Sequence, residues 1–267
     1  MSQDALDREK ILERFAQELD RITAATVLDR IKQMESAGQS EVTDFFDPAQ
    51  QRVAERVLHH FKALKHTVWG GYPEAERARV LIYPAARQSG ASQVPLAFIE
   101  IDPGREAAEL SHRDYLGAVL ALGLRREKIG DVLLTAAGVA QIVISPEMLP
   151  YLLGNLTAVG RFSVRLWEIG AQDLCPAVPR SREVRATVAS LRLDAVASAG
   201  FGLSRSKLVP AVRSGQVKLN WQSVKTPSAF VKEGDVISLA GRGRVEVTAV
   251  LGESRKGRLQ LLLKKHF

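Results

Sequence analysis

Between Pro95 and Ile169 the spacing of the apolar residues alternates between that of strands and that of helices, and this succession limits the fold more than any other feature. Strict alternation and short apolar runs predict strands, whereas spacings of three and four residues predict helices. The order βαββαβ predicts a ferredoxin-like domain, with four strands in one sheet and two helices on one face. The predicted elements are strands at Pro95–Ile101, Asp131–Thr135, Val139–Ser145 and Phe162–Ile169, with helices from about Arg113 to Leu122 and from Pro146 to about Leu156.

This arrangement does not define a function by itself, because many unrelated proteins share it. RNA-recognition domains have the same element order and stack bases on aromatic side chains of the sheet. The third predicted strand reads GVAQIVIS and contains neither Phe nor Tyr. If this domain contacts RNA, we expect it to use a surface other than the sheet.

The first part of the chain is predicted to be helical. Residues 3–36 carry apolar side chains at helical spacing, and Pro48 suits the first turn of another helix. The stretch WGGYPEAER, residues 69–77, then breaks the pattern and precedes a strand at Arg79–Tyr83. The predicted domains are a helical N-terminal segment 1–68, a ferredoxin-like domain 69–172, a linker 173–189 that ends in a strand, and a C-terminal domain 190–267, which together make an α+β protein.

Charge is distributed unevenly along the chain. From Arg180 to Phe267 there are 17 lysines and arginines against 6 acidic residues, while the preceding residues contain 20 against 24. A basic surface attracts polyanions such as nucleic acids. We therefore expect the partner-binding surface to lie in the last third.

Other features restrict the chemistry and the compartment. The single cysteine, Cys175, excludes a disulfide within the chain and a CxxC zinc site, so neither a metal nor a cofactor is predicted. The start, MSQDALDREKILERF, lacks the apolar region of a signal peptide, and no run approaches the roughly 18 apolar residues of a membrane span. These features predict a cytoplasmic protein without membrane association, or a mature protein of the plastid stroma.

The basic third is predicted to contain two helices followed by short strands. Ser204 suits the N-cap of the second helix and Gly215 its end. This helix begins with two hydroxyls and two cations beside free backbone N–H groups, a combination that suits a phosphate. Strands are predicted at Val217–Leu219, Val236–Leu239, Arg244–Val250 and Leu259–Lys264.

Four motifs, RLDAV, SRSKLV, SGQVKLN and VKEGDVI, follow one another in this third. In this order they resemble the S-four (S4) RNA-binding domain, which is named for a ribosomal protein of the small subunit. The resemblance implies two helices and a small sheet that present basic side chains to structured RNA. The implied RNA contacts are Arg192, Ser204, Arg205, Ser206, Lys207, Arg213, Lys218 and Asn220, and we add Trp221, Arg242 and Arg244 from the turns and strands that follow.

Two residues depart from the S4 pattern. Asn220-Trp221 stands where the family has Asn-Gly, so the residue that best adopts a positive φ is absent and an exposed indole is expected beside the RNA. Pro210 lacks an N–H inside the second helix and is expected to bend or weaken it.

The resemblance extends upstream of the S4 motifs. WGGYPEAER and SHRDYLGAVLALGLRREKIGD are similar to segments of YlmH-type proteins, in which a helical segment and an RNA-recognition-like domain precede the S4 domain. AGFGLSRSK, LNW and GRGRVEV are most similar to the cyanobacterial and plastid branch called photosystem II S4 domain protein. The resemblance implies a non-enzymatic, ribosome-associated protein that binds rRNA or tRNA, with a second RNA contact at Arg113, Arg125, Arg126 and Lys128.

Three alternatives are weighed against this interpretation. The triplet HRD at residues 112–114 does not indicate a kinase, because neither DFG nor a glycine-rich loop is present. RLD at residues 192–194 is similar to the catalytic segment of pseudouridine synthases, and an RNA-modifying enzyme guided by the S4 domain stays the alternative. Such an enzyme needs converging acids and bases, for which the scattered candidates are Glu100, Asp102, His112 and Asp114. As the third alternative, the acidic N-terminal helices suit a protein-interaction scaffold.

Overall fold

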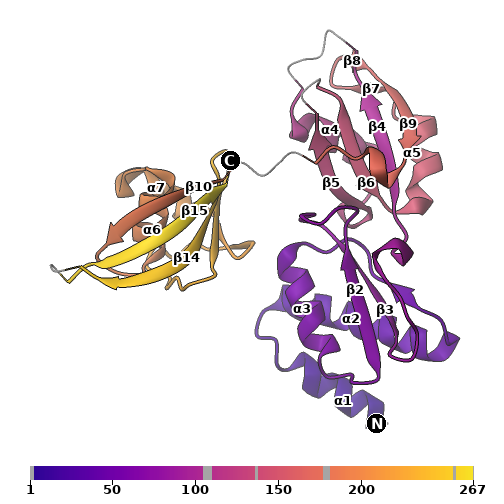
Figure 1. Ribbon diagram of the computed structural model, residues 1–267, viewed down its shortest axis with the longest axis horizontal. Coiled ribbons are helices and arrows are strands. Elements are labelled where there is room, and N and C mark those ends of the chain that lie inside the picture. The colour runs from indigo at the N-terminus through magenta and orange to yellow at the C-terminus, as the bar shows by residue number, and fades with distance from the viewer. Residues whose placement is uncertain (1–2, 105–109, 136–137, 177–180, 255–256, 267) are drawn as a thin grey trace. The chain divides into compact units, whose positions relative to one another are not determined.

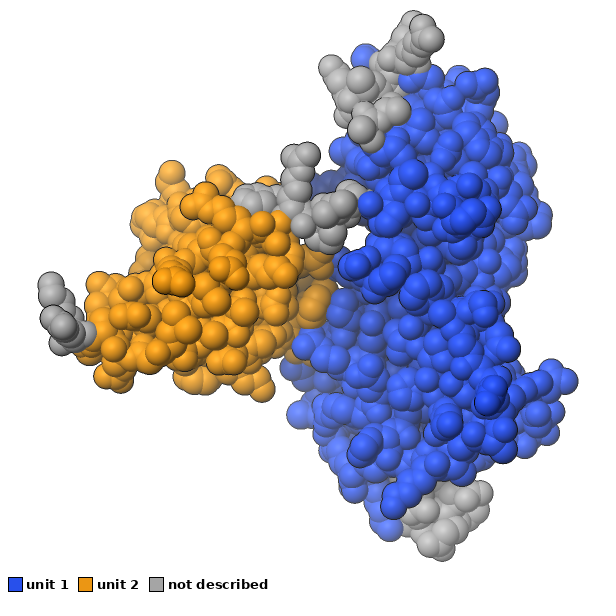
Figure 2. All heavy atoms as spheres, viewed as in Figure 1, with its two compact units in different colours: residues 1–177 blue, residues 178–267 orange. Residues whose placement is uncertain are grey.

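The computed structural model describes residues 3–104, 110–135, 138–176, 181–254 and 257–266. The chain is an α+β protein, as predicted, and its contacts divide into two units, residues 1–177 and 178–267 (Figure 1; Figure 2). Two residues of the predicted turn at 136–138, Ala136 and Ala137, lie outside the described residues. In the described part of the chain no helix is both long and apolar enough to cross a membrane.

The N-terminal domain contains the predicted helices. Gly38 adopts the left-handed conformation, with φ 66°, and ends the second helix, while the Asp47 carboxylate caps the third by accepting from the backbone N–H of Ala49 and Gln50. Val80 and Ile82 of a strand pack against the apolar faces of these helices. The helices are α1 (Gln3–Leu12), α2 (Glu18–Ala37) and α3 (Pro48–Leu58).

This domain also contains a sheet that helical spacing did not predict. The strands β1 (Glu41–Val42), β2 (Leu64–Trp69) and β3 (Arg79–Pro84) form a sheet in the order β1-β3-β2. The expected domain boundary at residue 68 therefore falls inside a sheet, and β3 belongs with the N-terminal helices rather than with the ferredoxin-like domain. The physical reason is the antiparallel pairing of Leu64 to Trp69 with β3, which outweighs the helical spacing of Leu64.

The middle domain has the predicted ferredoxin-like topology. Its antiparallel sheet has the order β5-β6-β4-β9, and Ile99 and Ile101 of β4 face the core beneath the two helices (Figure 1). The predicted last strand at 162–169 is divided, because β8 (Phe162–Ser163) pairs with β7 (Ala158–Val159) before β9 begins. The remaining elements are β4 (Ala97–Asp102), α4 (His112–Ala121), β5 (Ile129–Leu134), β6 (Ala140–Ile144), α5 (Leu149–Asn155) and β9 (Arg165–Ile169).

The face of this sheet that is turned away from the helices is partly covered by the chain itself. Gln141 of β6 is only 1% exposed, donates to the Asp173 carbonyl at 3.0 Å and accepts from the Cys175 backbone N–H at 2.7 Å. The segment that follows β9 thus lies over the middle of the sheet. This cover agrees with the expectation that the sheet does not stack bases.

The C-terminal unit has two helices packed on a six-stranded sheet of order β10-β15-β14-β13-β11-β12. Gly200 lets the first helix approach the sheet closely, because a Cβ there would lie 2.5 Å from Cγ1 of Val245. Leu208 and Val212 form the buried stripe of the second helix, while Val209 is only half-buried. The elements are α6 (Leu193–Phe201), α7 (Arg205–Arg213), β10 (Ser181–Val188), β11 (Val217–Leu219), β12 (Gln222–Ser223), β13 (Val236–Leu239), β14 (Gly243–Glu253) and β15 (Leu259–His266).

The strand β10 corrects the expected domain boundary at residue 190. It pairs with β15 along its whole length, from Ser181 opposite His266 to Val188 opposite Leu259. Val188 is buried in the core of the C-terminal unit. The strand expected at the end of the linker is thus present, but residues 181–188 belong to the C-terminal sheet as its edge strand rather than to a linker.

Candidate nucleic-acid interface

The start of α7 presents two hydroxyls and two cations together. Ser204, Arg205, Ser206 and Lys207, called here the α7 cluster, are all exposed. The Ser204 side chain does not cap the helix backbone, and its hydroxyl lies 2.9 Å from the Ser206 hydroxyl. The first N–H groups of a helix have no carbonyl partner within the helix. The cluster thus combines such N–H groups, the positive end of the helix dipole and two exposed cations, which is an arrangement suited to a phosphate.

Pro210 lies inside α7 and does not end it, while the expected bending or weakening of the helix stays a prediction. The helix continues to Arg213, and the Ser214 N–H donates to the Pro210 carbonyl at 2.9 Å. Leu208 and Val212 anchor the two sides of the proline in the core. Their burial supplies the tertiary support that compensates for the missing N–H.

Arg192 and Asp194 form a two-point ion pair beside α6. The Arg192 Nε and Nη2 atoms donate to the two carboxylate oxygens of Asp194, each at 3.1 Å. Burial opposes ionisation of Asp194, but the hydrogen bond and charge of Arg192, with a contribution from Arg205, outweigh it and lower the pKa of Asp194. Asp194 is 5% exposed, so it supports the domain while about half of the Arg192 side chain remains accessible.

The turn after β11 takes the backbone conformation expected of Asn-Gly despite its sequence. Asn220 and Trp221 have φ values of 51° and 68°. The Asn220 side chain donates to Asp235 at 2.8 Å and accepts from the Val236 N–H at 2.9 Å, which holds the turn. Trp221 is half-buried rather than exposed, because it is part of this held turn. Asn220 therefore has a structural use in the domain, and the exposed indole that was expected is not observed.

The other predicted contacts of the C-terminal unit differ in exposure. Arg213 at the end of α7, Lys218 in β11 and Arg242 in the turn between β13 and β14 are exposed, whereas Arg244 is half-buried. The unit thus holds several basic side chains at its surface in addition to the α7 cluster.

The basic loop after α4 has a different arrangement. Lys128 donates to Asp44 at 2.6 Å and to Glu147 at 2.9 Å. Arg126 donates to the carbonyls of Ile129 and Gly130, and burial, followed by the charge of Arg77, lowers its pKa to about 10. Both head groups are thus used within the first unit: Lys128 connects its two domains, and Arg126 bonds locally within the middle domain.

Arg125 and Arg113 remain at the surface. Arg125 is 72% exposed and lies 3.9 Å from Asp44, which is a loose ion pair. Arg113 is also exposed in the first turn of α4. Of the four basic residues predicted as a second contact, these two present accessible charge.

The acidic residues considered for catalysis have structural partners. Asp114 accepts from the backbone N–H and the hydroxyl of Ser111, at 2.7 and 2.6 Å, and so caps α4. Glu100 accepts from Gln141 at 2.7 Å, and Asp102 pairs with Arg165 at 2.7 Å. Among the described residues there is no group of three or more His, Cys, Asp or Glu side chains that could hold a metal ion.

Comparison with known proteins matches each part of the chain to a family model. Residues 20–86 match the N-terminal domain of YlmH, residues 91–173 match the model described as "Putative RNA-binding domain in YlmH", and residues 191–237 match the S4 domain. A relative from Bacillus subtilis, the "Ribosome-associated protein quality control protein P2", is 34% identical over 227 residues, which cover 84% of this chain and 87% of the relative. The chain belongs to the YlmH family. The first match includes β2 and β3, which agrees with their place in the N-terminal sheet.

Further matches support the family fold and its S4 domain. The "Cell division protein ylmH from Streptococcus pneumoniae" superposes with a TM-score of 0.51 at 27% identity, covering 60% of this chain and 96% of that one. The "Small ribosomal subunit protein uS4" of Acidithiobacillus ferrooxidans is 43% identical over 58 residues, which are 21% of this chain and 28% of that protein. The predictions of a YlmH-type chain and of an S4 domain are therefore confirmed.

One basic residue that contributes to the same surface was missed from the sequence. Arg258 stands just before β15 and donates to the Thr187 carbonyl of β10 at 3.1 Å. Its neighbourhood in the sequence is merely polar and basic, and no motif distinguishes it. The pairing of β10 with β15 brings Arg258 to a surface groove that is formed by β10, α6 and the start of α7 and that Arg205 also lines.

Proposed function

We propose that this YlmH-family protein binds structured RNA through its S4 domain, without catalysis, and associates with the ribosome by contacting rRNA or tRNA. The observation that carries the proposal is the α7 cluster, four exposed residues at a helix start in a unit with a large excess of basic side chains. The Bacillus subtilis relative, described as ribosome-associated, supports the ribosome as the partner.

The proposed contacts follow from exposure. The α7 cluster, Arg192, Arg213 and Lys218 present charge or hydroxyls at the surface of the C-terminal unit. In the first unit, Arg113 and Arg125 form the proposed second contact. Asn220, Arg126 and Lys128 are assigned to holding the fold, because their polar atoms already have protein partners.

Two finer assignments accompany the proposal. A ribosome-associated protein works where ribosomes are, so we assign the chain to the cytoplasm, with the plastid stroma as the alternative compartment. The similarity of AGFGLSRSK, LNW and GRGRVEV supports the cyanobacterial and plastid branch of the family. Neither assignment implies a physical link to photosystem II.

The test is RNA binding by the double variant Arg205→Ala with Lys207→Ala, measured by filter binding to tRNA and to isolated ribosomal subunits at several salt concentrations. We expect the affinity to fall by about tenfold and the slope of log affinity against log salt to flatten by about 1.4 to 1.8, since each neutralised phosphate contributes about 0.7 to 0.9. The control is Arg182→Ala with Arg185→Ala, which removes the same charge from two exposed positions of β10. Binding curves that coincide with those of the unmodified protein at every salt concentration would contradict the proposal.

The RNA-modifying enzyme is not adopted as a second function, because the acidic candidates already hold structural contacts. The distinguishing measurement is mass spectrometry of nucleosides after incubation of the protein with total RNA. New modified nucleosides that depend on the protein would reverse this choice.

A further inference from the structure

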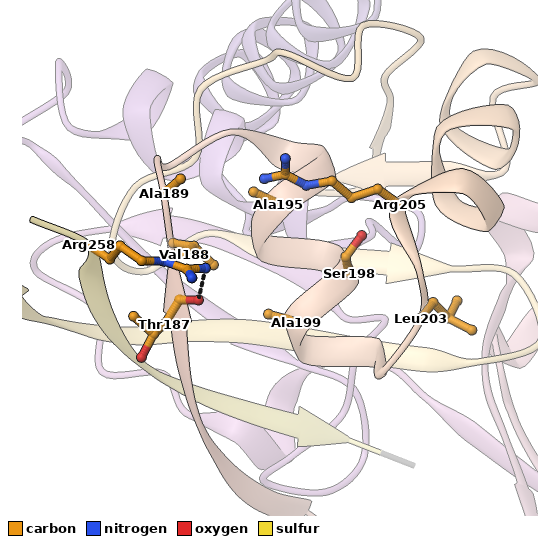
Figure 3. A pocket seen from close by; sticks show the side chains of 9 residues that line it. All are labelled: Thr187, Val188, Ala189, Ala195, Ser198, Ala199, Leu203, Arg205 and Arg258. Atoms are coloured by element: carbon orange, nitrogen blue, oxygen red, sulfur yellow. Dashed lines mark hydrogen bonds between the residues drawn. The ribbon is translucent and has the colours of Figure 1, made fainter. Parts of the chain in front are cut away.

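A groove of about 570 Å³ lies beside the α7 cluster, where β10, α6 and the start of α7 meet (Figure 3). The end of β10, residues 187–189, forms one side and the exposed side of α6 the other. Only part of this groove belongs to the stretch that matches the S4 domain, because β10 and Arg258 lie outside residues 191–237. The groove is thus a product of the S4 helices together with the flanking strands of this chain.

Two arginines from distant parts of the sequence flank the groove. Arg205 extends from the start of α7 toward Ala195 of α6, while Arg258 lies over β10 (Figure 3). The bond from Arg258 Nη2 to the Thr187 carbonyl, at 3.1 Å, holds this guanidinium in position. The described residues that line the groove include no Asp or Glu. The groove therefore favours an anionic ligand.

The floor between the arginines is mainly apolar. It is formed by the small or aliphatic side chains of Val188, Ala195, Ala199 and Leu203. Ser198 adds one hydroxyl, which is buried and has no hydrogen-bond partner within the described part of the chain. In Figure 3 this hydroxyl points toward the Arg205 side chain. An apolar floor with two cations at its edges suits a planar ring that carries a phosphate.

We propose that this groove receives one unpaired nucleotide of the bound RNA, with its base on the apolar floor and its phosphate between Arg205 and Arg258. The inference rests on the proposed function and adds the kind of RNA structure that is recognised. Sites for small ligands usually have volumes of about 300–1,000 Å³, so the groove is large enough for one nucleotide. Arg205 belongs both to the α7 cluster and to the groove, which joins the backbone contacts to a base contact. Proteins read RNA mainly at unpaired nucleotides, whose bases are free to leave the stack.

The experiment compares two RNA hairpins with the same stem and loop, one of which carries a single unpaired adenosine. The unmodified protein is expected to bind the bulged hairpin about tenfold more tightly, in line with the usual contribution of one stacked base. Ala199→Phe fills the groove without changing charge, and Arg258→Ala removes one flanking cation. Both variants are expected to lose most of this preference while retaining their affinity for the fully paired hairpin. Arg182→Ala, with the same loss of charge on the outer part of β10, is expected to keep the preference.

The outcomes separate this inference from the proposed function. Equal binding of both hairpins by the unmodified protein, or a preference that survives in both groove variants, would overturn the groove assignment and leave RNA binding intact. Binding of neither hairpin, and of neither tRNA nor ribosomal subunits, would instead remove the proposed function. Thermal unfolding of each variant shows whether it is folded, and Arg258→Ala, at an exposed position, carries the test if Ala199→Phe is destabilised.

A second arm distinguishes a nucleotide within RNA from a free one. Adenosine monophosphate is titrated alone and as a competitor of the bulged hairpin. Weak competition, at concentrations far above those of the hairpin, supports the assignment to RNA. Tight binding of the monophosphate without a preference for the bulged hairpin would assign the groove to a free nucleotide and overturn the proposal.

Discussion

Two short segments of this chain that carry basic side chains have different surroundings. In LRREKIGD, residues 124–131, Lys128 is held by two carboxylates and Arg126 by two carbonyls. In the α7 cluster, Arg205 and Lys207 are exposed at a helix start. The difference shows that a basic motif becomes a candidate for RNA binding only where the fold leaves its cations accessible. Where acceptors surround the motif, the same side chains join domains.

The largest effect on stability is expected at Asp131, the last residue of LRREKIGD. Its carboxylate accepts from the Tyr72 hydroxyl at 2.7 Å and from the N–H groups of Glu76 and Arg77, at 2.7 and 3.1 Å. Asp131→Ala is expected to destabilise the first unit by about 3 kcal/mol, because three donors lose a charged acceptor. Urea unfolding followed by fluorescence measures this in a Trp221→Phe background, where the remaining tryptophans, Trp69 and Trp167, lie in the first unit.

Two comparisons test that explanation. Tyr72→Phe removes one of the three hydrogen bonds and is expected to cost about 1 kcal/mol. RNA affinity is expected to stay unchanged in both variants. An Asp131→Ala protein as stable as the unmodified one would show that the bonds around LRREKIGD contribute little to the fold.

An intermediate loss of stability is expected when Lys128 is replaced, and Lys207 serves as its comparison. Lys128→Ala leaves Asp44, whose side chain is 21% exposed, without its closest cation, and is expected to cost about 2 kcal/mol. Lys207→Ala removes the same residue type from the exposed cluster and is expected to change stability by less than about 0.5 kcal/mol, while it lowers RNA affinity. Unfolding and filter binding of the two variants in parallel measure both effects. A loss of stability in Lys207→Ala together with a loss of RNA affinity in Lys128→Ala would contradict the distinction between the two segments.

Acid is expected to weaken the C-terminal unit through Asp194. The pKa of this group is lowered in the folded state, so the stabilisation is complete above the unfolded pKa of about 3.9 and disappears as the pH falls through the folded value. Asp194→Asn is therefore expected to reduce the loss of stability between about pH 5 and pH 2. Trp221 fluorescence in a background of Trp69→Phe and Trp167→Phe reports on this unit. Parallel pH profiles of the two proteins would contradict a role for the Arg192–Asp194 pair.

The smallest effect is expected at Arg125. This side chain is 72% exposed and its ion pair with Asp44 is loose, so Arg125→Ala is expected to change stability by less than about 0.5 kcal/mol. A loss of RNA affinity of about twofold to fivefold would support the proposed second contact, since one phosphate contact is removed. Arg52→Ala, in α3 of the same unit, serves as the control for a general loss of positive charge.

Local patterns were sufficient for the elements that depend on near neighbours. The elements of the βαββαβ order and the strands β11 and β13 were predicted to within three residues of their observed bounds, apart from the divided strand before β9, and the two S4 helices were also predicted. Spacing and caps determine such elements, and these are properties of contiguous residues. The residues of the α7 cluster were predicted for the same reason.

The tertiary structure decided what depends on distant partners. It paired β2 with β3 and β10 with β15, where the local spacing had indicated the end of a helix and a linker. It also gave Lys128, Arg126 and Asn220 their acceptors, and it placed Arg258 beside a groove that begins at Arg205. The sequence by itself thus determined the family, the order of the elements and the charge of the last third. Which cations reach solvent was decided by the fold, because exposure depends on contacts between residues far apart in the chain.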